Sequence, residues 1–263
     1  MTSISKGLIL DRRSLIAGAS ALGIAGLMGR PALAQETPVR GGVFVMGIGG
    51  GSTTDDFDLR KLTDWVPVNQ AYMVMNGLVE IDKDNVAQPE LFESWTAAEG
   101  AVEWTFKVRQ GVTFHNGKTL TAEDIIYSLN LHRGDTTSAA RSIAEAFKDV
   151  AKVSDTEVKI TLASGNADLP YVLSDYHFLV VPDGFTDWAN PVGTGPFVYE
   201  SYEPGVRSRF IRNESYWKPG CANVDAVEVI VINDISAHTN ALMSGQVHAI
   251  NSLDFKTVDL LRQ

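Results

Sequence analysis

Apolar and polar side chains alternate along several parts of the chain. Between residues 102 and 108, Val102, Trp104, Phe106 and Val108 are separated by Glu103, Thr105 and Lys107. A period of two residues is typical of a strand with one buried face, so this segment is predicted to be such a strand. The same pattern, or a short apolar run, predicts strands at 42–46, 78–81, 86–87, 150–153, 158–162, 178–181, 197–202, 207–212, 227–232 and 247–250.

Helical spacing of apolar residues appears after Pro67. A helix is expected there because proline suits a first helical turn. Its buried face is predicted to consist of Val68, Tyr72, Met75 and Leu78, which recur at intervals close to 3.6 residues.

Capping and turn signals place further helices. Thr121-Ala122-Glu123-Asp124 resembles a capping box and predicts a helix over 122–132, preceded by a turn at Asn116-Gly117. Two more helices are expected at 136–147 and 237–243. With strands and helices interspersed, the chain is predicted to be a mixed α/β protein.

Glycine-rich segments of the chain do not fit nucleotide binding. Five residues separate Gly111 from Gly117, whereas a phosphate loop has four between its glycines. The glycines at 47–51 approach a dinucleotide fingerprint, but Ser52 stands in place of the third glycine. Both segments are therefore interpreted as turns or loops.

Composition excludes several classes of function. The 263 residues are 44% hydrophobic and 21% charged, as in a globular protein, and the formal net charge is −10. An acidic surface disfavours nucleic acid as a partner. The single cysteine, Cys221, excludes an internal disulfide, a cysteine-rich zinc site and a cysteine-ligated iron–sulfur cluster.

Residues 1–34 have the layout of an export signal. Arg12 and Arg13 precede an uncharged stretch at 15–29, and Ala32-Leu33-Ala34 forms a small-residue cleavage site. The stretch is shorter than the roughly 20 residues of a membrane-spanning helix. The paired arginines resemble a twin-arginine signal, and an ordinary secretory signal is the alternative. Both lead out of the cytoplasm, and the absence of a cysteine after Ala34 predicts a periplasmic protein without a lipid anchor.

Signals of catalysis are sparse. The histidines lack metal-binding spacing and are each expected at the surface or in a turn; they are His115, His132, His177, His238 and His248. No serine lies in a nucleophile elbow. We therefore predict neither an enzyme nor a bound cofactor or metal.

Asp55, Asp56 and Asp58 form the one tight acidic cluster. A solvated loop is the simpler interpretation. A site for a cationic or amine-bearing ligand is the alternative, because the loop follows a strand end, where concave sites form.

Several motifs together resemble the family 5 solute-binding proteins of ABC importers. The motifs are WTFKVRQGVTFHNG at 104–117, LTAEDI at 120–125, PVGTGPF at 191–197, Tyr216-Trp217, Glu93-Ser94-Trp95 and Asn76-Gly77-Leu78-Val79. The resemblance covers about residues 41–260. Trp104, Phe106 and Val108 fit a packing face, and Gly193 and Gly195 fit a tight entry into a strand.

The resemblance implies a type II periplasmic-binding-protein fold in which a subdomain is inserted into the first lobe. Lobe I is expected to comprise 35–75 and 178–263, and the inserted subdomain 76–177. A second lobe is expected after Leu253 and is missing from the 263 residues, so we interpret the chain as an N-terminal portion.

The resemblance also implies function. We expect a monomeric substrate-binding component that delivers a small solute, by default a peptide, to the membrane permease of an ABC importer. Nickel complexes, opines and oligosaccharides are bound by other family members. The ligand-binding loop is expected at Ser52, Thr53, Thr54, Asp55 and Asp56. Met75 and Asn76 replace the family's usual tyrosine and glutamate, a departure from an ordinary peptide site. The alternatives are a twin-arginine-exported periplasmic enzyme and an inactive truncated remnant.

Overall fold

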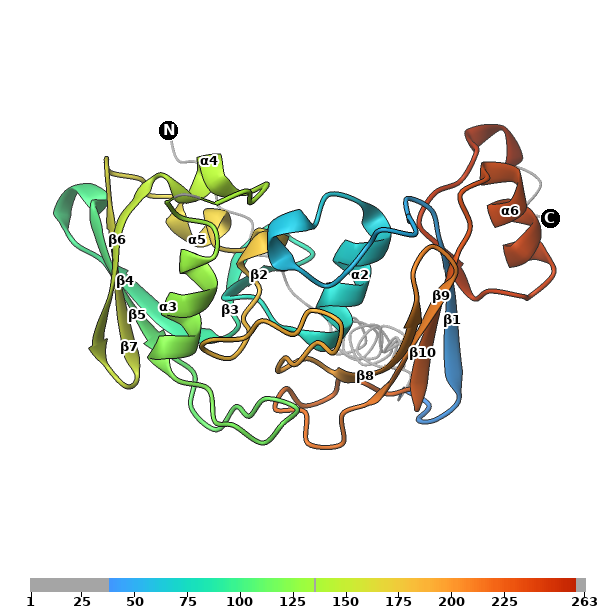
Figure 1. Cartoon of the computed structure of the whole chain (residues 1–263), viewed down its shortest axis with the longest axis horizontal. Coiled ribbons are helices and arrows are strands. Elements are labelled where there is room, and N and C mark those ends of the chain that lie inside the picture. The colour runs from blue at the N-terminus through green and yellow to red at the C-terminus, as the bar shows by residue number, and fades with distance from the viewer. Residues whose placement is uncertain (1–37, 135, 259–263) are drawn as a thin grey trace, which may run out of the picture. The chain divides into compact units, whose positions relative to one another are not determined.

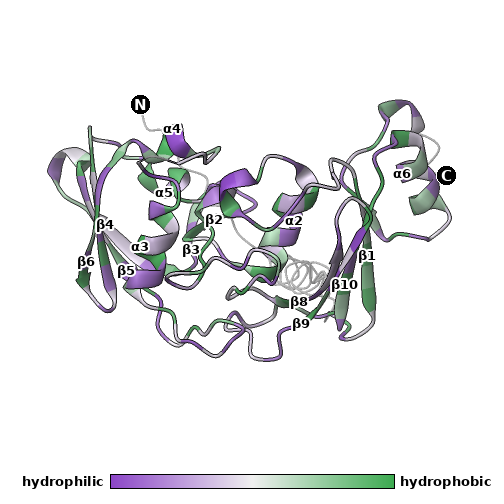
Figure 2. Cartoon of the chain, viewed as in Figure 1, coloured by the Kyte–Doolittle hydropathy of each residue, from purple (hydrophilic) through white to green (hydrophobic). Residues whose placement is uncertain are grey.

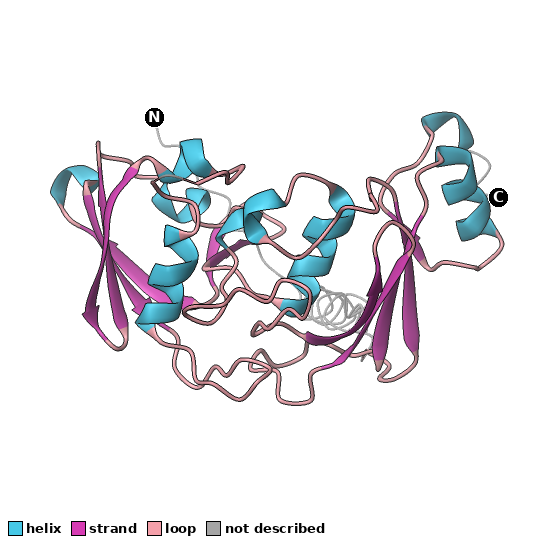
Figure 3. Ribbon diagram, viewed as in Figure 1, coloured by secondary structure: helices cyan, strands magenta, loops and turns pink. Residues whose placement is uncertain are grey.

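The computed structural model describes residues 38–134 and 136–258 (Figure 1). The predicted export signal at 1–34 lies outside these residues. Strands and helices are interspersed along the described chain, as the mixed α/β prediction requires (Figure 3). Within the described residues, no helix is both long enough and apolar enough to cross a bilayer.

A mixed five-stranded sheet has the order β11-β1-β10-β9-β8. Its members are β1 (Val43–Ile48), β8 (Phe197–Glu203), β9 (Arg207–Arg212), β10 (Ala226–Val231) and β11 (Ala249–Ile250). β1 pairs in parallel with β10 and β11, whereas β9 pairs antiparallel with β10 and β8. Strand β1 therefore comes from the start of the described chain, whereas β10 and β11 on either side of it come from the end. Apolar residues predominate along β1 (Figure 2).

An antiparallel four-stranded sheet has the order β4-β5-β7-β6. It is built from β4 (Phe92–Ala97), β5 (Glu103–Val108), β6 (Phe147–Ser154) and β7 (Glu157–Leu162). Trp104, Phe106 and Val108 are buried on one face of β5, which confirms the alternation predicted for this strand. A separate hairpin joins β2 (Val79–Ile81) to β3 (Ala87–Pro89).

Five described α-helices connect these strands. They are α2 (Trp65–Val74), α3 (Ala122–Asn130), α4 (Arg141–Ala144), α5 (Leu169–Val172) and α6 (Ile235–Met243). Single turns of 3₁₀-helix occur at η1 (Leu59–Lys61), η2 (Glu99–Ala101), η3 (Tyr176–Phe178) and η4 (Phe255–Thr257). The predicted capping box opens α3, where the Asp124 carboxylate accepts from the backbone N–H of Thr121 at 2.8 Å.

The buried apolar residues form two clusters. One joins the four-stranded sheet to α3 and includes Leu78 and Val180, while the other lies between the five-stranded sheet and α2 and includes Met75, Leu179 and Val181. The segments at 75–78 and 178–181 thus contribute to both clusters. They meet where the Val180 backbone N–H donates to the Asn76 carbonyl at 3.0 Å.

The helix predicted at 136–147 is wrong over most of its length. Only Arg141–Ala144 is α-helical, and Phe147 already begins β6. Before this helix, side-chain hydroxyl groups accept hydrogen bonds from backbone N–H groups. Thr136 Oγ1 accepts from Ser138 N at 3.2 Å, and Ser138 Oγ accepts from Ala140 N at 3.1 Å. Such local bonds compete with helix formation.

The buried face predicted for the helix after Pro67 is only partly correct. Met75 and Leu78 are fully buried but lie beyond the end of α2, and Val68 is half-buried. The helix begins at Trp65, before Pro67, and its buried residues are Val66, Pro67, Gln70, Ala71 and Val74. Tyr72 is 43% exposed. The strand predicted at 178–181 is likewise not formed; η3 ends at Phe178 and the next residues are extended outside any sheet.

Candidate functional site

The loop that follows β1 leaves from one edge of the five-stranded sheet. β1, β10 and β11 run parallel and end at Ile48, Val231 and Ile250. Their carboxyl ends therefore share that edge. Ligand sites of open α/β sheets form outside the carboxyl ends of the strands.

Two asparagines fix the start of this loop. Asn233 Oδ1 accepts from the backbone N–H groups of Gly50 and Gly51 at 3.0 and 3.3 Å, and Asn251 Oδ1 accepts from Gly49 N at 3.0 Å. Asn251 directly follows β11, and Asn233 lies two residues beyond the end of β10. Because side chains occupy these glycine donors, the loop presents no row of free amides to a phosphate.

The residues predicted to bind ligand, at 52–56, lie just beyond this clamp. Ser52 N donates to Asp55 Oδ2 at 2.8 Å, and Thr54 N donates to Ser52 Oγ at 3.3 Å, so the loop turns on its own side chains. Ser52, Thr53 and Thr54 are exposed. Burial raises the pKa of Asp55, and the nearby carboxylates of Asp64 and Asp56 raise it further.

The acidic cluster is partly neutralised by its own loop. Lys61 Nζ lies 2.6 Å from Asp56 Oδ2. Asp58 is 2% exposed and receives two bonds from Arg60, at 2.8 Å from Nε and 2.7 Å from Nη2. Burial opposes ionisation of Asp58, but these bonds hold its pKa below the usual value. Asp58 therefore belongs to the scaffold that supports η1.

A groove of about 420 Å³ follows the exposed face of α2. Its lining residues are Thr63, Asp64, Trp65, Val68, Tyr72 and Tyr176, and we refer to it as the α2 groove. Trp65 is 64% exposed and Tyr72 is 43% exposed. Residues 65, 68 and 72 share one helix face because they are three or four positions apart. Asp64 caps the helix by accepting from Trp65 N at 2.8 Å.

The predicted loop and the α2 groove are neighbours. Val66 N donates to the Gly50 carbonyl at 3.2 Å. Gly50 has φ of +82°, and a Cβ added there would lie 2.0 Å from Asp64 Oδ1. Only glycine combines this backbone conformation with so close an approach. The loop and the first turn of α2 thus form one surface.

Negative charge surrounds the aromatic residues of the groove. Burial raises the pKa of Tyr72 to about 12, with further contributions from the charges of Glu90 and Asp175. Burial and the Asp175 charge also raise the pKa of Tyr176. Among the described residues, neither Asp55 nor Asp64 forms an ion pair.

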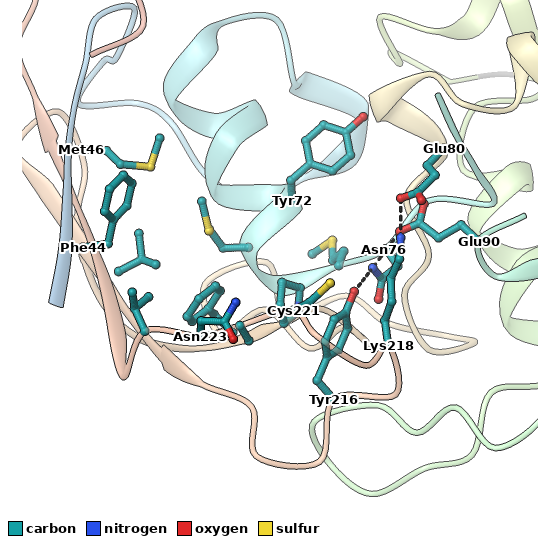
Figure 4. A pocket seen from close by; sticks show the side chains of 17 residues that line it. Phe44, Met46, Tyr72, Asn76, Glu80, Glu90, Tyr216, Lys218, Cys221 and Asn223 are labelled. Atoms are coloured by element: carbon teal, nitrogen blue, oxygen red, sulfur yellow. Dashed lines mark hydrogen bonds and ion pairs between the residues drawn. The ribbon is translucent and has the colours of Figure 1, made fainter. Parts of the chain in front are cut away.

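A second pocket, of about 430 Å³, lies between α2 and the five-stranded sheet (Figure 4). Tyr72 lines both this pocket and the α2 groove. Apolar and sulfur-containing side chains make up much of the wall, among them Phe44, Met46, Met73, Met75, Phe197 and Cys221. Asn76, Glu80, Glu90, Tyr216 and Lys218 form its polar end (Figure 4).

Asn76 uses its whole hydrogen-bonding capacity within the protein. Its Nδ2 donates to Glu90 Oε1 at 2.8 Å and to Tyr216 Oη at 2.9 Å (Figure 4). Its Oδ1 accepts from Thr194 Oγ1 at 2.9 Å and from Trp217 Nε1 at 3.1 Å. Asn76 therefore joins four segments of the scaffold and has no bond left for a ligand.

The polar end of the second pocket is largely self-paired. Lys218 Nζ lies 2.5 Å from Glu80 Oε2. Glu90 is 8% exposed, and its burial raises its pKa to about 7. Because these groups bond one another, the second pocket offers a ligand mainly apolar contacts. The α2 groove has exposed aromatic rings and one carboxylate, Asp64, that forms no ion pair among the described residues.

The prediction that every histidine lies at the surface or in a turn is wrong for His177 in η3 and His238 in α6, whereas His132 does lie in a turn. His132, His177 and His238 are buried, with exposures of 0%, 5% and 1%. His132 Nδ1 is 2.6 Å from Ser138 Oγ, and burial lowers the pKa of His132 to about 4. Within 38–134 and 136–258, no group of three or more His, Cys, Asp or Glu side chains could hold a metal ion.

Sequence reasoning missed the α2 groove because it placed Tyr72 in the core. The available signal was the mixed character of 65–74, in which Trp65 and Tyr72 share a helix with Asn69 and Gln70. This mixture leaves no clean apolar face, which is atypical of a helix that serves only packing.

Comparisons with known proteins agree on one family. Residues 86–263 match the sequence model of the bacterial extracellular solute-binding proteins, family 5 Middle. The oligopeptide-binding protein AppA of Bacillus subtilis (strain 168) is 27% identical over 237 residues, covering 84% of this chain and 43% of AppA.

Solved structures give the same result. The structure of AgaA from A. tumefaciens R10 with agropinic acid has a TM-score of 0.73 at 26% identity, covering 78% of this chain and 43% of AgaA. DppA from Helicobacter pylori with the peptide STSA has a TM-score of 0.75 at 21% identity, covering 85% of this chain and 49% of DppA. The type II periplasmic-binding-protein fold is thereby confirmed, and the chain spans less than half the length of these relatives.

Proposed function

Because the chain belongs to family 5 of the bacterial extracellular solute-binding proteins, we propose that it acts as the substrate-binding component of an ABC importer. It captures a small solute outside the cytoplasm and presents it to the membrane permease. The action is reversible binding without bond chemistry.

The α2 groove is the observation that carries this proposal. Exposed apolar groups on a soluble protein mark a binding surface when they gather in a hollow. Trp65 and Tyr72 form such a hollow with Tyr176, beside the carboxyl ends of β1 and β10. The loop at 52–56 adjoins it and supplies hydroxyl groups and a carboxylate to the same ligand.

Peptide is the ligand class we favour. AppA is named for oligopeptide binding and DppA was solved with the peptide STSA, whereas AgaA was solved with agropinic acid. Aromatic rings that pack on side chains, next to polar groups that bond a backbone, suit an extended peptide.

A two-part organisation accompanies this function. We assign 35–75 and 178–263 to the first lobe and 76–177 to an inserted subdomain. Two observations support the division. Each part has its own sheet, and the chain passes from one apolar cluster to the other within the segments 75–78 and 178–181.

Calorimetric titration of the full chain tests the proposal. The titrants are di- and tripeptides together with agropinic acid, and the variants are Tyr72→Ala and Tyr171→Ala. Tyr171 is the matched control because it is 46% exposed and lies on α5, outside the groove. Loss of one aromatic contact should weaken binding about tenfold in Tyr72→Ala and leave the control unchanged.

Two results would contradict the proposal. Failure of every titrant to bind at about 1 mM would remove the solute-binding function. Equal losses in both variants would place the ligand outside the α2 groove.

A further inference from the structure

The aromatic wall of the α2 groove can hold a flat or aliphatic group. Trp65 and Tyr72 present exposed rings on one face of α2, and Tyr176 closes the groove from η3. Rings of this kind also attract a cation placed over their faces, most strongly in the case of tryptophan.

One carboxylate, Asp64, lines the groove, and two more lie near it on separate segments. Asp64 is exposed at the first turn of α2, Asp55 belongs to the loop after β1, and Asp175 precedes η3. Hydrogen bonds from His177 N and Nδ1 reach Asp175 Oδ1 at 3.0 and 2.7 Å and favour its charged form.

The nearby cations are already engaged. Arg60 is bonded to Asp58 and Lys61 to Asp56. Within the described residues, the lining of the groove contains no lysine or arginine. An anionic ligand would therefore meet only negative charge, whereas a cation would meet carboxylates and ring faces together.

We propose that the α2 groove selects solutes in which a positively charged group adjoins an aromatic or aliphatic body. This inference rests on the proposed solute-binding function and defines its substrate class. A peptide with a basic side chain next to an apolar one has this chemistry.

Three dipeptides that share a carboxyl-terminal phenylalanine test the charge preference. Arginyl-phenylalanine, alanyl-phenylalanine and glutamyl-phenylalanine are titrated into the full chain, with tryptophan fluorescence as the readout. At about 20 mM salt the arginyl peptide should bind about ten times more tightly than the glutamyl peptide. At about 500 mM salt the ratio should fall to about threefold, because salt screens exposed charges.

Asp64→Asn examines the charge without removing the helix cap. Asparagine caps helices as well as aspartate does, so α2 should remain folded. The ratio between arginyl and glutamyl peptides should fall from about tenfold to about threefold at low salt. Asp84→Asn is the matched control, because Asp84 is an exposed carboxylate in the turn between β2 and β3. It should leave the ratio unchanged.

The outcomes separate the two proposals. Equal affinity for all three dipeptides would overturn the charge preference and leave solute binding intact. A ratio unaffected by Asp64→Asn would overturn the assignment of this preference to the α2 groove. Tighter binding of the glutamyl peptide would also overturn the charge preference. Absence of binding by all three dipeptides would remove both the preference and the peptide-binding function.

Discussion

Strand β5 and helix α2 each carry a tryptophan, but the two side chains have opposite environments. Trp104 on β5 is 6% exposed, stacks on Phe106 with ring centroids 6.0 Å apart, and donates to the Ala101 carbonyl. Trp65 on α2 is 64% exposed and borders a groove. Burial of an aromatic ring stabilises the fold, whereas an exposed ring is available to a ligand. The difference therefore separates scaffold from binding surface.

Replacing each tryptophan with alanine should give the largest contrast. Trp104→Ala should lower the free energy of unfolding by about 3 to 5 kcal/mol, because it leaves a cavity in the apolar cluster between the four-stranded sheet and α3. Trp65→Ala should lower it by less than about 0.5 kcal/mol and weaken peptide binding. Denaturant unfolding and calorimetric titration measure the two effects.

Similar losses of stability in Trp104→Ala and Trp65→Ala would contradict the difference in environment between the two tryptophans. Trp65 would then be packed in the folded protein, and the α2 groove would lose its main aromatic contact.

Where packing alone determines burial, the sequence was a good guide. The alternation in β5, the strands of the five-stranded sheet and the capping box of α3 were all predicted, because each depends on residues close in sequence. Gly193 and Gly195 were predicted to permit a tight backbone entry, and a Cβ at either would lie within 2.5 Å of α2 backbone atoms. Sequence alone could not identify α2 as the neighbouring segment, which is about 120 residues distant.

Sequence analysis failed where a polar residue is buried or an aromatic one exposed. Gln70 is fully buried beside Ser208, to which its Nε2 donates at 3.0 Å, while Tyr72 lies at the surface. Both depend on tertiary contacts that periodicity does not contain. The loop at 52–56 was expected to bind ligand because of the family resemblance, and the adjoining groove emerged only from the packing of α2 against that loop.

A second contrast concerns pH. Glu90 directly follows β3 and accepts a hydrogen bond from Asn76. Burial raises the pKa of Glu90 to about 7. Tyr216, Glu80 and Lys218 line the same pocket. A carboxyl whose folded pKa exceeds its unfolded pKa binds more protons in the folded state. Its contribution to stability is therefore greatest below the unfolded pKa and decreases as pH rises through about 7.

Glu90→Gln should remove this pH dependence. The difference in unfolding free energy between the wild type and the variant should change by about 2 kcal/mol between pH 5 and pH 8, with the wild type losing stability. Taking the difference cancels the titration of His132, whose lowered pKa acts in the opposite direction. A difference that stays constant with pH would show that Glu90 titrates normally. Glu123→Gln, at an exposed site on α3, is the control.

Lys61→Ala should have the smallest effect on stability, and it tests whether negative charge beside the α2 groove favours a cationic peptide. Lys61 is 61% exposed and pairs with Asp56, which is 34% exposed, so the ion pair contributes less than about 0.5 kcal/mol to stability. Removing the lysine frees the Asp56 carboxylate in the loop at 52–56. The affinity for arginyl-phenylalanine should then rise about twofold at low salt, and the gain should vanish at high salt. Lys83→Ala, which breaks a similar exposed pair with Asp84, should change neither quantity. A weaker affinity in Lys61→Ala would mean that the lysine itself contacts the peptide, and the negative character assigned to this surface would be wrong.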